Sequence, residues 1–232
     1  MKAYVAGKPI LSTTDWPSNV CCVVFFTGCN LRCRFCFNTP LLEFDEKFQV
    51  DIDQIYKEIE ASRFLIDGVL VTGGEPTLQH ESLLAIAEWT HEQNLKFGLQ
   101  TNGTKPSIIQ QLLDANLIDY IAVDIKTIPN ATEYAQVTQI KQKILPEIKK
   151  TIAILKSSNI HYEFRTTLVP SLVYKETQLR KILKWVGPNN YVLQAFRPTD
   201  TVLDSKLKAS FSNEELDKFR KFAHKNNVVT RF

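Results

Sequence analysis

Short apolar runs and amphipathic stretches alternate along most of the chain. Six runs rich in Val, Ile, Leu, Tyr and Phe predict buried strands at 20–27, 68–72, 96–100, 120–125, 162–168 and 191–196. Stretches with apolar residues at helical spacing predict helices at 51–62, 81–93, 106–115, 143–157, 176–186 and 213–225. Pro106 opens one of these helices, and Ser212 is the expected N-cap of the last.

This alternation predicts the fold class. Six strand–helix units imply parallel strands joined by right-handed crossovers. Eight units would close a full barrel, so six predict an α/β protein with a partial (β/α)6 TIM-like barrel. A catalytic site is then expected at the carboxyl ends of the strands. No internal repeat or low-complexity linker stands out, which predicts a single domain over residues 1–232.

The composition also indicates where in the cell the protein is expected. The 232 residues are 44% hydrophobic, which is typical of a globular core, and the longest apolar run is far too short to span a bilayer. Lys8 and Asp15 interrupt the N-terminal stretch where a signal peptide would be apolar. Five clustered cysteines, an odd number, do not form a secreted disulfide framework. We expect a cytoplasmic protein with no membrane partner.

The charge is mildly positive. The net charge is +3, whereas a nucleic-acid footprint is normally more basic and interleaved with aromatic residues. We therefore expect no nucleic-acid partner. Lysines gather at Lys141, Lys143, Lys149, Lys150 and Lys156, and their helical spacing predicts a solvated helix face. A docking surface for an acidic protein is the alternative.

The strongest chemical signal is the triplet Cys29, Cys33 and Cys36, spaced Cys-x₃-Cys-x₂-Cys. Closed zinc sites and fully ligated iron–sulfur clusters normally take four protein ligands. Three thiolates on a cubane cluster leave one iron open to bind a substrate. Half a zinc site or ordinary buried thiols are the alternatives. Cys21 and Cys22 lie in a predicted strand and point to opposite faces, so we expect them in the core.

The triplet, with Phe35 just before its third cysteine, resembles the signature of the radical S-adenosylmethionine (SAM) superfamily. The resemblance implies one [4Fe–4S] cluster on Cys29, Cys33 and Cys36, with the amino and carboxylate groups of SAM on the open iron. It also implies reductive cleavage of SAM to a 5′-deoxyadenosyl radical that abstracts a hydrogen atom. The cofactors carry this chemistry, while the protein orients them and excludes water. Phe35 is expected near the adenine.

Two further motifs gain meaning from the resemblance. Gly73, Gly74 and Glu75 follow the second strand, and glycines allow close approach of a ligand. This segment resembles the one that holds the SAM amino group, although alone it would be a turn. Asp124 and Lys126 are two residues apart and share a strand face. They match the Asp-x-Lys of glycyl-radical activating enzymes, in which the lysine meets the SAM carboxylate.

Other positions match less closely. Asn102 follows the third strand, where similar proteins often have Asp-Thr-Asn-Gly, but here Gln100 replaces the acid. Arg165 lies on the fifth strand and either lines the cofactor pocket or fills the barrel. Related activating enzymes usually have His-Asn after the third cysteine, whereas this chain has Phe37. Asn102 and Arg165 remain expected SAM contacts.

Whole-chain likeness narrows the expected activity. The segments Ser12-Thr13-Thr14-Asp15-Trp16-Pro17, Gly-Cys-Asn-Leu-Arg-Cys and Glu-Phe-Arg-Thr-Thr resemble the short activating proteins of anaerobic ribonucleoside-triphosphate reductase. The resemblance implies a glycyl-radical enzyme as protein substrate and a flavodoxin- or ferredoxin-type electron donor. The chain shows no long insertion to act as a lid, which favours a protein substrate over a small molecule.

Two other functions stay open. A small-molecule radical SAM enzyme such as 7-carboxy-7-deazaguanine synthase usually has an acid after the third cysteine and a hydroxyl that helps bind magnesium. Phe37 argues against it, while Thr39 leaves some room. A non-catalytic electron carrier or metal-binding module is the other alternative. A carrier prefers a closed four-ligand cluster, so the missing fourth cysteine counts against it.

Overall fold

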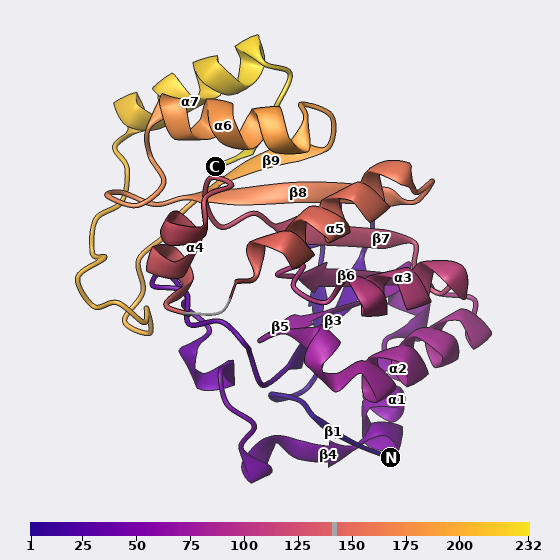
Figure 1. Ribbon diagram of the computed structural model, residues 1–232. Helices are drawn as coiled ribbons and strands as arrows, with labels where there is room; N and C mark the ends of the chain where they lie inside the picture. Colours follow the sequence, from indigo (N-terminus) through magenta and orange to yellow (C-terminus); the bar gives the residue numbers. More distant parts are fainter. Residues whose placement is uncertain (141–142) are drawn as a thin grey trace.

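The computed structural model describes residues 1–140 and 143–232 and is built around one large, mostly parallel sheet (Figure 1). Its strands are β1 (Lys2–Tyr4), β2 (Ile10–Ser12), β3 (Cys21–Phe26), β4 (Gln49–Asp51), β5 (Gly68–Gly73), β6 (Lys96–Thr101), β7 (Tyr120–Asp124), β8 (His161–Leu168), β9 (Tyr191–Ala195) and β10 (Val229–Arg231). The sheet order is β10-β9-β8-β7-β6-β5-β3-β2, and β1 pairs separately with β4.

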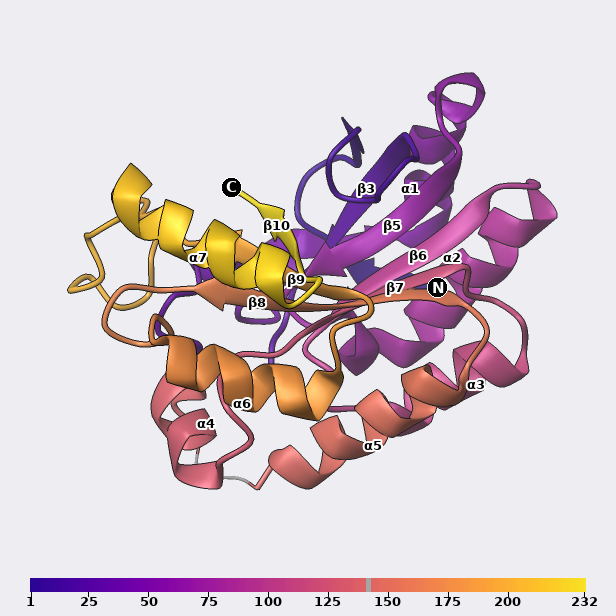
Figure 2. The same cartoon turned by 90° about the horizontal axis from the view of Figure 1, so that it is seen from above.

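The helices cover the outer face of the curved sheet (Figures 1 and 2). They are α1 (Ile52–Glu60), α2 (His80–Glu92), α3 (Pro106–Asp114), α4 (Ala131–Thr138), α5 (Leu145–Ser157), α6 (Glu176–Val186) and α7 (Asn213–Lys225). Short 3₁₀ helices are η1 (Thr39–Leu41), η2 (Glu46–Phe48), η3 (Arg63–Leu65) and η4 (Pro76–Gln79). None of the helices in the described ranges is long and apolar enough to cross a membrane.

Strands β3, β5, β6, β7, β8 and β9 run parallel, which confirms the predicted α/β fold with six strand–helix units. The curved sheet is not closed. Its edges are β2, which is antiparallel to β3, and β10, which is parallel to β9. The sheet is thus a partial barrel whose open side lies between these two edge strands.

The predicted element boundaries agree with the structure to within a few residues, and local chemistry explains several of them. Asp51 caps α1 by accepting from the Asp53 amide, and Ser212 forms a capping box with Glu215 at the start of α7. Helix α5 begins with Pro146 in its first turn, where the missing amide hydrogen is harmless. Four strands and one helix were not predicted: β1, β2, β4, β10 and α4. Each of these strands has only three residues, and the helix has only about two turns.

Two apolar cores lie on the two faces of the sheet. The main core fills the space between sheet and helices, and it includes Cys22. A small inner core inside the barrel contains Trp16, Cys21 and Tyr120, with the Trp16 and Tyr120 rings stacked 5.2 Å apart. Cys21 and Cys22 are therefore buried on opposite faces, as predicted.

Gly98 leaves room for Trp16, because a Cβ there would lie 2.8 Å from the indole ring. The segment before β3 therefore enters the barrel and fills its amino-terminal end, below the level at which the strands end in loops. Among the grouped lysines, Lys143, Lys149, Lys150 and Lys156 are exposed, whereas Lys141 lies outside the described residues.

Candidate active site

A cavity of about 530 Å³ lies at the carboxyl ends of the parallel strands, where the fold predicts a catalytic site. All three cysteines of the triplet line it. Of the other predicted site residues, the cavity is lined by Phe35, Gly73, Gly74, Asn102, Asp124, Lys126 and Arg165. Glu75 is the exception, since it is fully buried and does not belong to the lining.

The loop that carries the cysteines, residues 28–38, is held by backbone hydrogen bonds; we call it the cluster loop. The Cys29 amide donates to the Leu42 carbonyl at 2.9 Å. The Arg32 and Arg34 amides donate at 2.9 Å to the carbonyls of Thr138 and Val137, at the end of α4. Carbonyls at a helix end have no intrahelical partner. The amides of the cluster loop and the carbonyls of the helix end therefore satisfy each other's hydrogen-bonding capacity.

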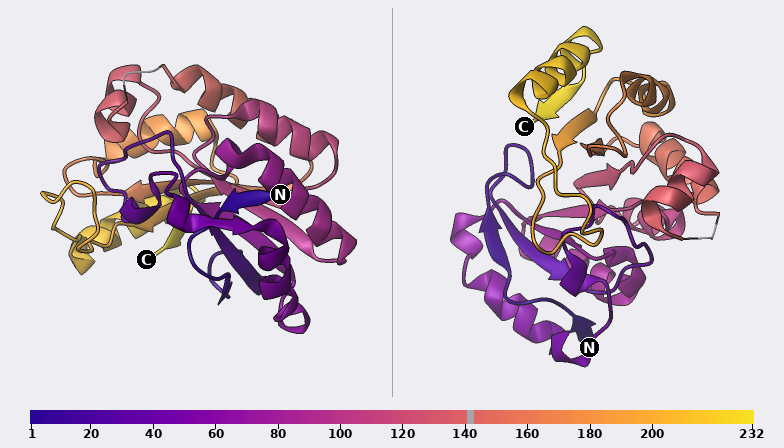
Figure 3. Two further views of the ribbon diagram at one scale, coloured as in Figure 1. Left: turned by 90° about the horizontal axis from the view of Figure 1, so that it is seen from below. Right: turned by 90° about the vertical axis from the view of Figure 1, so that its left-hand side faces the viewer.

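A long segment between β9 and α7, residues 196–212, crosses the mouth of the barrel to the cluster loop (Figure 3, right); we call it the strap. The Leu203 amide donates to the Cys36 carbonyl, and the Asp204 amide to the Arg34 carbonyl, each at 2.9 Å. The side chains of Arg34 and Asp204 form an ion pair at 2.8 Å. A segment over the cavity was not predicted, because the strap joins two elements of the fold rather than interrupting one.

Burial dominates the electrostatics of the three thiols. It raises the pKa of Cys33 to about 12 and that of Cys29 to about 11, and it also raises the pKa of Cys36. The Lys126 ammonium lowers all three values in part. Metal binding would release protons from these thiols, and Lys126 would offset the resulting negative charge.

The donor chemistry fits a cluster with one open iron, since three thiols from one loop face one cavity beside a fixed cation. Among residues 1–140 and 143–232, no three His, Cys, Asp or Glu side chains surround a single ion position.

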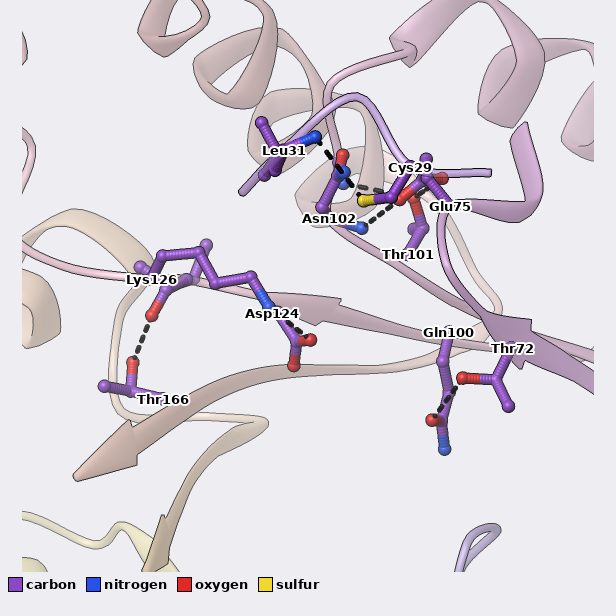
Figure 4. A network of polar contacts seen from close by, with 12 residues as sticks. Cys29, Leu31, Thr72, Glu75, Gln100, Thr101, Asn102, Asp124, Lys126 and Thr166 are labelled. Atoms are coloured by element: carbon purple, nitrogen blue, oxygen red, sulfur yellow. Dashed lines mark hydrogen bonds and ion pairs between the residues drawn. The ribbon is translucent and has the colours of Figure 1, made fainter. Parts of the chain in front are cut away.

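Lys126 and Asp124 form the charged wall of the cavity (Figure 4). The Lys126 ammonium donates to the Asp124 carboxylate at 2.8 Å and lies 5.7 Å from the centre of the Phe35 ring. Ile125 between them is fully buried on the other face, as the strand period predicts. Burial lowers the pKa of Lys126, but Asp124 and the thiols raise it by more, so the ammonium stays charged.

Gly73 and Gly74 pass too close to other backbone atoms to carry side chains. Gly73 has φ +118°, and a Cβ on Gly74 would lie 2.2 Å from the Gly28 carbonyl oxygen. The next residue, Glu75, has its carboxylate turned into the protein. It accepts from the Thr77 and Thr101 hydroxyls at 2.5 and 2.6 Å and from the Asn102 amide at 2.7 Å.

The Glu75 carboxylate also accepts from the Thr77 amide at 3.2 Å, which makes four donors in all. Burial raises its pKa despite these hydrogen bonds. In this arrangement Glu75 joins the loops after β5 and β6 next to Cys29 (Figure 4). The described structure thus gives it a positioning role.

Asn102 also ties elements together. The Asn30 side-chain amide donates to the Thr104 hydroxyl at 2.8 Å, and that hydroxyl donates to the Asn102 side-chain oxygen at 2.7 Å. The Asn102 side-chain amide donates back to Asn30 at 2.9 Å. These three side chains form a closed ring between the cluster loop and the loop after β6.

Arg165 belongs to a buried polar network beneath the cavity. It donates to Glu163 at 3.0 Å, to the Tyr120 hydroxyl at 2.5 Å and to the Asp15 carbonyl at 3.2 Å. Arg231 on β10 donates to the same Glu163 through both terminal nitrogens. The network thus joins β8 to the segment before β3, across the inside of the barrel, and holds the last strand.

Several residues that line the cavity were not predicted. They are Asp15 from the segment before β3, Thr72 from β5, Arg231 from β10, and Arg197 and Thr199 from the strap. Thr72 could have been predicted from the sequence, because alternate residues of a strand lie on the same face of the sheet. The others depend on long-range packing for which the sequence carries no local signal.

Comparisons with known proteins agree with this geometry. The sequence model described as "Radical SAM superfamily" matches residues 23–186. A Methanocaldococcus jannaschii protein named "Putative glycyl-radical enzyme activating enzyme" is 35% identical over 237 residues, covering 100% of this chain and 97% of its own length. A 7-carboxy-7-deazaguanine synthase of Thermococcus kodakarensis is 28% identical over 209 residues, covering 79% of this chain and 77% of its own.

The fold has counterparts among solved structures. A radical SAM methyltransferase from Sphaerobacter thermophilus matches with a TM-score of 0.71 at 14% identity, covering 95% of this chain and 67% of that one. The superfamily match runs from within β3 to the end of α6 and contains the cluster loop. It spans more than half of the sequence, so the chain belongs to the radical SAM superfamily, whose enzymes use a [4Fe–4S] cluster and SAM.

Proposed function

We propose that this radical SAM enzyme is an activase that generates a glycyl radical on a partner enzyme, and that the partner is an anaerobic ribonucleotide reductase. The observation that carries the proposal is end-to-end similarity to a relative named as a glycyl-radical enzyme activating enzyme. The reductase as partner rests on the resemblance of the segments at 12–17 and 163–167 to its activating proteins. We further propose that residues 1–232 act as one domain.

We assign the cofactor sites by position in the cavity. Cys29, Cys33 and Cys36 would bind the cluster, and Lys126 would meet the SAM carboxylate. The ion pair with Asp124 keeps Lys126 charged and limits its movement. When bound, the cluster and SAM supply reductive cleavage of SAM and hydrogen abstraction.

The remaining predicted contacts form the walls. Phe35 would stack near the adenine, and Gly73 and Gly74 would let the backbone approach the methionyl part of SAM. Glu75 and Asn102 would act by holding these loops in place, since their side chains already have protein partners. Arg165 would line the lower part of the cavity.

Below the cavity, the barrel is closed to water by side chains. Trp16 is 2% exposed and fills the inner core, and Gln100 and Arg165 both donate to the Asp15 carbonyl above it. Water excluded from this end cannot reach reactive species. The substrate would then approach only from the mouth or from the open side between β2 and β10.

A second candidate function is a deazaguanine synthase that acts on a small pterin. Two observations favour it: the similarity to the Thermococcus kodakarensis enzyme, and the strap, which covers part of the mouth as a lid would. The end-to-end relative weighs more, because it matches the whole chain at higher identity.

Electron paramagnetic resonance tests the proposal. The reconstituted protein, SAM, reductant and a candidate reductase are mixed without oxygen. We expect a glycyl doublet that collapses when the α-hydrogens of the partner's glycine are replaced by deuterium. A mixture with no doublet and rapid turnover of a small pterin would move the assignment to the deazaguanine synthase.

A further inference from the structure

A second cavity lies on the outer face of the barrel, between helix α6 and the segment that joins β7 to α4; we call it the outer cavity. Its volume is about 340 Å³, at the lower end of the roughly 300–1,000 Å³ that is typical of small-molecule sites. It shares no lining residue with the cavity at the cluster loop. The described residues that line it are Ile128, Pro129, Asn130, Lys181, Lys184 and Trp185.

Trp185 is the aromatic residue of the outer cavity, and it is held from two sides. The Tyr134 ring of α4 lies 6.3 Å from the Trp185 ring and at 84° to it. The Lys156 ammonium, on α5, donates to the Trp185 carbonyl at 3.0 Å. Ile128 and Pro129 add aliphatic surface beside the indole. Such a lining suits a flat ring, because aromatic rings gain energy from stacking as well as from burial.

The charged side chains of the outer cavity are both cations. Lys181 and Lys184 are exposed and lie three residues apart, on one face of α6. Among the described residues neither forms an ion pair, whereas Arg180 beside them is paired with Glu176. No acid lines the outer cavity in the described part of the chain. The two ammonium groups therefore keep their charge available for an anion.

The remaining polar side chain also offers donors. The Asn130 side-chain oxygen already accepts from the Glu133 amide at 3.0 Å, which leaves its NH₂ group to face a ligand. Lysine side chains have donors and no acceptor. The polar groups of the outer cavity thus favour a ligand rich in acceptor oxygens, such as a phosphate.

Apolar exposure in this region is confined to the outer cavity itself. Within the described residues, none of the highly exposed large apolar side chains belongs to α4, α5 or α6. A protein interface would normally need a broader exposed apolar patch. The outer cavity therefore fits a small molecule better than a protein.

We propose that the outer cavity binds a small phosphorylated aromatic compound, of which a nucleoside monophosphate is the simplest form. The ring would stack against Trp185, and the phosphate would accept from Lys181, Lys184 and the Asn130 amide. Hydrogen bonds between ammonium and phosphate groups are stronger than those between neutral groups. This site is independent of the proposed function and of the partner enzyme.

Helix α4 connects the outer cavity to the cluster loop. At its first turn the Tyr134 amide donates to the Asn130 carbonyl at 2.9 Å. At its other end the Val137 and Thr138 carbonyls accept from amides of the cluster loop. Local opening of α4 would release both ends together. A ligand that binds only the closed form therefore slows hydrogen exchange in the cluster loop.

Calorimetry on the reconstituted protein, saturated with SAM so that the cofactor cavity is filled, tests the site. The probes are the four ribonucleoside monophosphates, with adenosine and inorganic phosphate as partial ligands. Lys184→Glu reverses a charge in the outer cavity. Lys57→Glu is the matched control, since Lys57 is exposed on α1, on the opposite side of the molecule from α6 (Figures 1 and 2).

We expect at least one nucleotide to bind once per chain, and adenosine or phosphate alone to bind at least tenfold more weakly. Lys184→Glu should weaken nucleotide binding at least tenfold, because it replaces an attractive charge by a repulsive one. Trp185→Leu should weaken it about fivefold through the loss of stacking. Lys57→Glu should match the unmodified protein. With nucleotide at ten times its Kd, hydrogen exchange of the cluster loop, followed by mass spectrometry, should slow about tenfold.

No nucleotide binding, or equal losses in Lys184→Glu and Lys57→Glu, would overturn the proposal. An acidic peptide with one aromatic residue that binds more tightly than every nucleotide would assign the outer cavity to a protein partner and also overturn it. Nucleotide binding that leaves hydrogen exchange of the cluster loop unchanged would overturn the connection through α4.

Discussion

Glu75 provides the sharpest test of the site, because its position in the structure differs from the role its motif implies. The carboxylate is fully buried and accepts four hydrogen bonds. In Glu75→Gln one carboxylate oxygen becomes an NH₂ group. If the remaining oxygen stays with Thr77 and Thr101, the new NH₂ faces the Asn102 amide, where an acceptor stood at 2.7 Å.

The expected cost follows from that geometry. The Asn102 amide would lose a hydrogen bond to a charged acceptor, and a buried donor left without a partner costs about 1–3 kcal/mol. The loss of charge also weakens the three remaining hydrogen bonds. A destabilisation of about 2–3 kcal/mol lowers the melting temperature of a domain of this size by roughly 4–12 °C.

Urea unfolding of the metal-free protein measures this cost without involving either cofactor. Glu88→Gln is the matched control, since Glu88 is exposed on α2 and its variant should stay within about 0.5 kcal/mol. SAM affinity of the reconstituted Glu75→Gln protein should fall only modestly. Unchanged stability together with a large loss of SAM affinity would refute our reasoning and restore Glu75 as a direct SAM contact.

Three other predictions address the charges and thiols of the site. Cys33→Ala should abolish SAM cleavage and lower iron content, while Cys22→Ala should retain both; full cleavage by Cys33→Ala would disprove the ligand assignment. Lys126→Ala should weaken SAM binding in calorimetry and leave iron content near normal. Burial raises the pKa of Glu163, but Arg231 and its neighbours lower it further, to below the ordinary 4.5. The stability lost in Glu163→Gln should therefore be greatest above pH 4.5 and shrink as acid protonates the unmodified protein, a trend that urea unfolding at graded pH would check.

The sheet could be predicted from the sequence because its strands are short continuous apolar runs. Strand β5 ends at Gly73 and β7 at Asp124, so the chemical motifs and the strand ends coincide. The cluster loop was found from its cysteine spacing alone. These signals are local, and the fold brings them together at one edge of the sheet because parallel strands share a direction.

The contacts that complete the site could not be predicted, because they join residues far apart in the chain. Arg34 and Asp204 are 170 positions apart, and Glu163 and Arg231 are 68 apart. Strand β10 has three residues, too few to show an alternating pattern. Trp16 reads as an isolated aromatic residue, and only the space left by Gly98 shows that it fills the barrel.

Gln100 stands where similar proteins often have an aspartate, and its hydrogen bonds give a physical reason for the difference. Its side-chain oxygen accepts from the Thr72 hydroxyl at 3.0 Å, and its NH₂ group donates to the Asp15 carbonyl at 3.2 Å. An aspartate at this position would have no hydrogen to donate, and it would face the carbonyl with a second acceptor. Gln100 thus helps to hold the segment that carries Trp16. We therefore expect any SAM contact near Gln100 to be made through its neutral amide, without a charge.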